Sequence, residues 1–193
     1  MVARVPETGS RQGIVSPQYL PRRRTFISDG AESLPMHPTA RKFADQVRDS
    51  HGFEVTIEEF PEGTKTADDA AAAVGCDVAQ IVKSIVMRVG DETVVVLTSG
   101  ANRVDEATLA SEFGVEQGSV RSANPGEVKE ATGWSIGGVP PTCHATDCPV
   151  LADPTFESFD RIWAAAGTPK AVFRLTPGDL QTLSEPQFVD VFE

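Results

Sequence analysis

The sequence predicts one mixed α/β domain, built around a curved and largely antiparallel sheet with helices around it. Strand-like and helix-like segments are intermixed along the chain, without an internal repeat or a strict strand–helix–strand rhythm. Two β-rich segments, 80–89 and 93–99, are joined by a short Gly-Asp-Glu turn, which is typical of an antiparallel hairpin. A chain of 193 residues suffices for one well-buried domain and is short for two.

Helix ends are marked by polar capping residues at the start and by glycines at the end, because such residues satisfy or terminate the open backbone groups of a helix. The predicted helices run from Pro38 to near Gly52, from Thr66 to Gly75, from Asp105 to Gly114, from Asn124 to Gly133, and onward from Thr176. Besides the hairpin, the predicted strands are 53–60, 149–153, 161–167 and 171–175, with a short helical turn at Asp153-Pro154.

The first 36 residues differ in composition from the rest. They contain Pro, Gly and Ser without sustained periodicity, and five arginines against three acids, so we expect residues 1–36 to be a flexible extension and 37–193 to be the domain. The run Arg22-Arg23-Arg24 reads as a solvated tail or as a nucleic-acid contact. The remaining 12 basic and 25 acidic residues leave a net charge of −13, which confines any phosphate contact to a local patch.

Composition also bears on location and partners. No apolar run approaches the roughly 18 residues that cross a bilayer, and the N-terminus lacks the apolar core of a secretory signal, so we expect a cytoplasmic protein without a membrane partner. Three cysteines do not make a complete disulfide framework, and thiols are expected.

Lys83 interrupts an apolar row, because strand alternation places it on one face with Ile81, Ile85 and Met87. One interpretation is a lysine at the sheet rim that extends its ammonium to water. The other is a partly desolvated ammonium with a depressed pKa that binds a phosphate or a polar substrate.

The segment GWSIGGVPPTCH, residues 133–144, is too rich in glycine and proline for a regular helix or strand. It is either a rigid turn or a loop whose backbone N–H groups bind a carbonyl oxygen that becomes negative during attack. It lacks the Gly-Lys-Ser/Thr ending of a phosphate-binding loop.

Several polar residues near this loop allow two interpretations. Cys143, His144, Asp147 and Cys148 have poor spacing for zinc and for a nucleophile pair, so we expect no metal and assign His144 to a pocket wall. Asp153 is either a helix cap or a pocket residue. For Arg103, which follows a strand, the alternatives are a phosphate contact and an ordinary surface position.

The ordered set of segments resembles the YbaK/ProX-type aminoacyl-tRNA editing domain family. The segments are HPTARKFADQV, FPEGTKTADDAAAAVG, QIVKSIVMRV, TSGANRVDEATLA, EATGWSIGGVPPTCHA, CPVLADPTFESFDRIWAAAGTP and AVFRLTPGDL, and they run from about residue 37 to the C-terminus. The resemblance implies a mixed α/β fold around a curved sheet, and hydrolysis of the ester between a wrongly attached amino acid and the 3′-terminal adenosine of tRNA.

The resemblance also implies roles for individual residues. Lys83 matches the family's active-site lysine, and Gly137 and Pro141 match the ends of its GxxxP loop, so the backbone at Gly137 and Gly138 is expected to hold the scissile carbonyl. Asp153, the turn that ends at Gly167, His144 and Arg103 are the expected substrate-binding positions. Many relatives have glycine where this chain has Cys143.

The implied enzyme is a trans-editing deacylase without a cofactor, acting on the acceptor end of mischarged tRNA, with an aminoacyl-tRNA synthetase as a further partner. In this family attack is ascribed to substrate assistance, so the protein orients the ester and stabilises the oxyanion. The alternative is a non-catalytic module that binds a tRNA 3′ end or a nucleotide in the same pocket.

Overall fold

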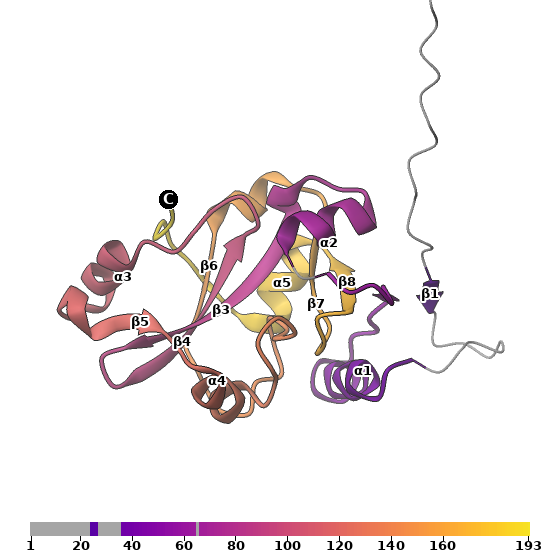
Figure 1. The fold of residues 1–193 in the computed structure, drawn as a ribbon, viewed down its shortest axis with the longest axis horizontal. Helices are drawn as coiled ribbons and strands as arrows, with labels where there is room; N and C mark the ends of the chain where they lie inside the picture. Colours follow the sequence, from indigo (N-terminus) through magenta and orange to yellow (C-terminus); the bar gives the residue numbers. More distant parts are fainter. Residues whose placement is uncertain (1–23, 27–35, 65) are drawn as a thin grey trace, which may run out of the picture.

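The computed structural model describes residues 24–26, 36–64 and 66–193. Within this part of the chain the strands form one curved, mixed sheet in the order β1-β2-β8-β7-β3-β4-β6-β9 (Figure 1). β5 is outside this order and pairs with β3 on the edge that also pairs with β7. The strands are β1 Arg24–Phe26, β2 Ile57–Glu59, β3 Ile81–Val89, β4 Glu92–Ser99, β5 Val120–Ser122, β6 Val150–Ala152, β7 Ile162–Ala165, β8 Ala171–Leu175 and β9 Gln187–Phe188.

The strand pairs are mostly antiparallel, and the predicted fold class is confirmed. Parallel pairing occurs between β3 and β7, between β4 and β6, and between β6 and β9. The predicted hairpin is β3–β4, in which Val89 is opposite Glu92 and Gly90-Asp91 make the turn. This long hairpin is the centre of the sheet.

The helices begin where capping chemistry predicts, and α1 to α4 end at the predicted glycines; no end was predicted for α5, whose C-cap is Glu185. They are α1 Pro38–His51, α2 Ala67–Val74, α3 Glu106–Phe113, α4 Pro125–Thr132 and α5 Pro177–Ser184, with short 3-10 turns η1 Val78–Gln80, η2 Gln117–Ser119 and η3 Pro154–Ser158. The Thr66 side chain accepts from Asp69 N while the Asp69 carboxylate accepts from Thr66 N, and the two contacts form a capping box at the predicted start of α2. α1 ends at Gly52, whose φ of 63° is left-handed. None of the helices in the described ranges is long and apolar enough to span a bilayer.

Two local predictions differ from the structure. Only Ile57–Glu59 of the predicted strand 53–60 pairs in the sheet. Phe53 and Val55 are partly buried against the core but have no partner among the described strands. Sequence reasoning also missed β5, whose three residues lie between a 3-10 turn and the Asn124 cap of α4. Such a short segment has no periodicity to detect.

The core lies on both faces of the sheet. On one face, Phe43 of α1, Phe173 of β8 and Phe156 of η3 are fully buried with Trp134. On the other face, Met87 and Val94 of the hairpin pack with Leu109 of α3. A third cluster joins the alanines of α2 to Trp163 of β7. The central hairpin is therefore fixed from both sides.

The predicted N-terminal extension falls almost wholly outside the described residues. Its described part is Met36, which packs on the core, and β1, which pairs antiparallel with β2. Arg22 and Arg23 lie outside the described ranges. The boundary at residue 37 stays a prediction.

Candidate functional site

The sheet has a gap along β3. On the edge opposite to β4, β7 pairs with Ile81 and Val82, and β5 pairs with Met87 to Val89. The Val86 carbonyl accepts from Ala123 N, after which the chain turns into α4 at Asn124-Pro125. The middle of β3 therefore has no neighbouring strand on this side, and the gap opens into a cavity.

The cavity has a volume of about 440 Å³, within the size range of small-molecule sites. Its wall is mainly apolar, with side chains from β3, β7, β8, α2 and α4 and from the loop that follows α4. Lys83, Ser84, Ser122, Thr64 and Thr66 supply its polar side chains. A cavity of this kind can hold a small apolar group with a few polar contacts.

Lys83 and Gly137 line the same cavity, although they are far apart in the sequence. The Lys83 side chain is half-buried, and its Nζ donates to the main-chain oxygens of Asn102 at 2.6 Å and Gly100 at 3.4 Å. Burial, together with the positive charge of Arg103, lowers the pKa of Lys83, while Asp153 and Asp68 oppose this shift. The structure thus brings a partly desolvated amine and the glycine-rich loop to one wall.

Asp153 is linked to Lys83 through Asn102, whose side chain bonds to Asp153 and whose main-chain oxygen accepts from Lys83. Its carboxylate is 1% exposed; Oδ1 accepts from Thr155 N at 2.9 Å, and Oδ2 accepts from Ser99 N at 3.0 Å and Asn102 Nδ2 at 2.9 Å. The carboxylate therefore caps η3 and at the same time holds the residue whose carbonyl receives Lys83. Asp153 is absent from the cavity wall.

The loop after α4 packs closely against the turn at Gly167 and Thr168. The Gly138 N–H donates to Ser135 O, and an added Cβ on Gly138 would lie 2.7 Å from the Thr168 Cα. Gly167 has a φ of 86°, and a Cβ there would lie 2.8 Å from the Trp134 ring. Glycine is required at both positions, because backbone and a buried ring occupy the space of a side chain. Neither glycine lines the cavity, whereas Gly137 does.

Pro141 and His144 line a second and smaller cavity of about 170 Å³, on which Cys143, Asp147 and Cys148 also lie. The His144 Nε2 is 2.9 Å from Pro140 O, and burial lowers the pKa of His144. In the described part of the chain, no three His, Cys, Asp or Glu side chains are placed to hold a metal ion. Cys143 has a φ of 60°, a left-handed conformation that glycine adopts more easily.

Arg103 is exposed and lines neither cavity; its main chain pairs with Glu193. Its guanidinium is near enough to influence Lys83 electrostatically. The predicted site residues thus divide between the main cavity, its supporting contacts, the second cavity and the surface.

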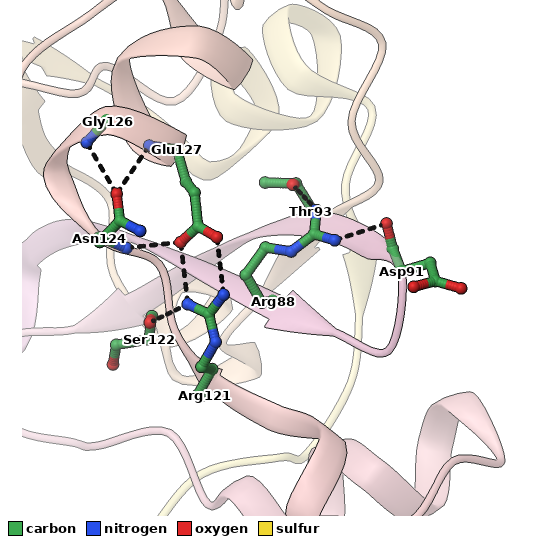
Figure 2. Close-up of polar contacts among 8 residues, drawn as sticks. All are labelled: Arg88, Asp91, Thr93, Arg121, Ser122, Asn124, Gly126 and Glu127. Carbon is green, nitrogen blue, oxygen red and sulfur yellow. Dashed lines mark hydrogen bonds and ion pairs between the residues drawn. The ribbon is translucent and has the colours of Figure 1, made fainter.

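A salt bridge fixes the cavity wall formed by β5 and α4 (Figure 2). Arg121 contacts Glu127 through both arms of its guanidinium, at 2.6 and 2.8 Å, and Glu127 Oε2 accepts from Asn124 N. The Arg121 hydrogen bond and the Asn124 N–H lower the pKa of Glu127 to about 2. This contact holds the turn from which Ser122, Ala123 and Val128 reach the cavity.

Sequence reasoning missed Ser84, Ile136 and Asn102. Ser84 follows Lys83 in a strand otherwise rich in β-branched residues, which is a weak signal for a polar wall. Ile136 is 55% exposed and lines the cavity, so it lies at the rim. Asn102 had no signal in the sequence, because its contacts come from other parts of the chain.

The fold and the cavity define a single-domain α/β protein with a mostly apolar cavity beside a strand lysine. Residues 61–183 match the model of the aminoacyl-tRNA editing domain, and the chain belongs to this family. The resemblance noted in the sequence is therefore confirmed.

Similar proteins agree with this assignment. The uncharacterized protein YwhH of Bacillus subtilis is 31% identical over 132 residues, which cover 68% of this chain and 82% of that protein. The proline–tRNA ligase of Shouchella clausii is 32% identical over 139 residues, 72% of this chain and 24% of the ligase. A crystal structure of a proposed trans-editing enzyme for prolyl-tRNA synthetase has a TM-score of 0.76 and 39% identity, and the match covers 82% of this chain and 99% of that one.

Proposed function

We propose that the protein is a trans-editing aminoacyl-tRNA deacylase, a cytoplasmic hydrolase that cleaves the ester of mischarged tRNA. The observation that carries this proposal is the position of Lys83 and Gly137 on the wall of one cavity, in a chain of the editing-domain family. Because relatives include proline–tRNA ligases, tRNA for proline is the first substrate to test. The cavity would take the amino acid while the tRNA stays outside.

In this proposal the ester carbonyl lies against Gly137. Water adds to the carbonyl carbon, the bond to the ribose oxygen breaks, and that oxygen leaves with a proton. The Gly137 N–H, which has no hydrogen-bond partner among the described residues, is the candidate donor to the oxyanion. Gly138 has a packing role instead, since its N–H already donates to Ser135 O. An ester is activated enough to need no protein nucleophile.

Lys83 is assigned to binding and orienting the ester or the terminal ribose. Its ammonium keeps donor capacity beyond the carbonyls of Gly100 and Asn102 and is partly desolvated, which strengthens a hydrogen bond to an oxygen of the substrate. Asp153 is a positioning residue that acts through Asn102. Pro141, His144 and Gly167 support the loop, and Arg103 is proposed to contact a phosphate of the acceptor end.

The net charge of the protein limits the size of its contact with tRNA. With a net charge of −11, the chain has no broad basic surface, so the footprint is expected to be small, at the acceptor end, and weakened by salt. The alternative, a module that binds a tRNA 3′ end without hydrolysis, uses the same cavity and differs only in turnover.

The test is a deacylation screen. Proline tRNA is charged separately with alanine, serine, cysteine and proline, since a proline site admits amino acids no larger than proline by mistake. At least one mischarged form should be hydrolysed, and Lys83→Ala should reduce that rate by about 10²-fold or more.

Lys129→Ala is the matched control, because the Lys129 ammonium also donates to a main-chain oxygen, that of Gly133, but lies outside the cavity. Its rate should stay close to that of the unmodified protein. Binding without turnover of every form would support the non-catalytic module instead, and full activity of Lys83→Ala would remove Lys83 from the mechanism.

A further inference from the structure

The gap in the sheet leaves the main chain of Ser84 without a partner among the described strands on the edge opposite to β4. Gly100 N donates to Ile81 O, so the odd-numbered residues of β3 direct their backbone groups to β4. The even-numbered residues therefore face the other edge, as the bond from Ala123 N to Val86 O demonstrates. On this edge Val82 pairs with β7, Arg88 pairs with β5, and Val86 O accepts from Ala123 N, which follows β5. Ser84 lies between them and has no strand partner on this edge in the described part of the chain; its partner on the other edge is Leu97 of β4.

The side chain of Ser84 is also unpaired. Its Oγ is buried and has no hydrogen-bond partner, which is costly for a hydroxyl. Three other side-chain oxygens in the described residues share this state, on Gln46, Glu58 and Ser184, but none of them belongs to a residue of the main cavity. Ser84 thus brings main-chain groups without a strand partner to a mostly apolar wall, with its unpaired Oγ buried beside them.

The Ser84 carbonyl and hydroxyl favour a ligand that donates hydrogen bonds. A main-chain carbonyl only accepts hydrogen bonds, whereas a serine hydroxyl both accepts and donates. The buried Ser84 Oγ reaches a ligand in the cavity by moving to another staggered χ1 rotamer. A ligand with several N–H donors satisfies both, and a cationic amine does so most strongly. An aminoacyl ester carries such a group, the α-ammonium, two bonds from its carbonyl carbon.

We propose that Ser84 binds the α-ammonium of the aminoacyl group, through its main-chain carbonyl and its Oγ. This inference rests on the proposed function, because it places the ester carbonyl at Gly137 and the amino-acid side chain in the apolar part of the cavity. Ser84 then distinguishes aminoacyl esters from other acyl esters, whatever the side chain.

The test measures binding, so that it does not depend on turnover. Two non-hydrolysable ligands are compared, 3′-amino-3′-deoxyadenosine acylated with alanine and the same nucleoside acylated with propionate, which lacks only the amine. Alanine is chosen because its methyl group is small enough for any side-chain preference. Calorimetry or NMR titration gives both affinities at a pH where the amine is charged.

The unmodified protein should bind the alanyl ligand about tenfold or more tightly than the propionyl ligand, as expected for hydrogen bonds to a charged group. Ser84→Ala should reduce this ratio several-fold by weakening only the alanyl ligand. Ser184→Ala, which removes another buried unpaired hydroxyl outside the main cavity, should leave the ratio unchanged.

Equal binding of the two ligands by the unmodified protein would overturn the inference, and so would an unchanged ratio in Ser84→Ala or failure of both ligands to bind. These outcomes are distinct from failure of the proposed function, which is hydrolysis. A protein that prefers the alanyl ligand but hydrolyses no mischarged tRNA keeps the Ser84 assignment and loses the deacylase.

Discussion

The Nζ of Lys83 lies 2.6 Å from the main-chain oxygen of Asn102, and the Asn102 side-chain amide is held in turn by Asp153. The amine that borders the cavity is therefore positioned by a buried carboxylate that does not border it. Through this contact the end of β4 and the start of η3 control where the ammonium lies. The arrangement leads to the first two predictions.

Asn102→Ala should loosen the carbonyl that receives Lys83. The ammonium then becomes more solvated, and its depressed pKa should move back up toward the ordinary lysine value. NMR titration of the lysine side chains measures this directly. Deacylation should fall through kcat more than through KM, because the lost contact orients Lys83 and does not bind tRNA. An unchanged lysine pKa and rate would contradict the positioning role.

Asp153→Ala should lower the free energy of unfolding by about 2–4 kcal/mol, because it leaves the buried N–H of Ser99 and the partly buried N–H of Thr155 without partners. Asp105→Ala is the matched control, since Asp105 also caps a helix but is not buried. Loss of that cap should cost about 1 kcal/mol. Denaturant unfolding of both variants tests the difference, and equal costs would show that capping is all that Asp153 does.

Gly138→Ala should displace the loop. Its Cβ would lie 2.7 Å from the Thr168 Cα and 2.8 Å from the Thr168 N, and backbone atoms do not give way as a flexible side chain does. We expect lower thermal stability and loss of deacylation, because Gly137 moves with its neighbour. Gly118→Ala is the control, since a Cβ there meets nothing within 4 Å. Normal stability and activity of Gly138→Ala would mean that the loop tolerates movement.

Glu127→Gln should weaken the contact that joins β5 to α4, in a manner that depends on pH. The folded protein lowers the pKa of Glu127 to about 2 from 4.5, so its stabilisation is fully present above about 4.5 and is lost as the pH falls toward 2. The difference in Tm between the two proteins should therefore be largest near neutral pH and vanish in acid. A difference that persists unchanged to pH 2 would contradict the assignment.

Much of the fold could be predicted because its signals are local. The cap at Asp105, the Thr66–Asp69 capping box and the glycine at the end of α1 each act within one turn of helix. β5 and the contacts of Asn102 escaped prediction, because they exist only through partners distant in the sequence. The resemblance pointed to Lys83 and Gly137, yet gave no sign that Gly138 serves packing.

The sequence by itself determined the fold class, the helix boundaries and the family, since caps, turns and ordered motifs are written in neighbouring residues. Only the tertiary structure decided where the sheet opens and which residues face the opening. Strand register joins residues that are distant along the chain, so the unpaired edge at Ser84 and the meeting of Lys83 with Gly137 arise only when β5, β7 and the loop after α4 pack around β3.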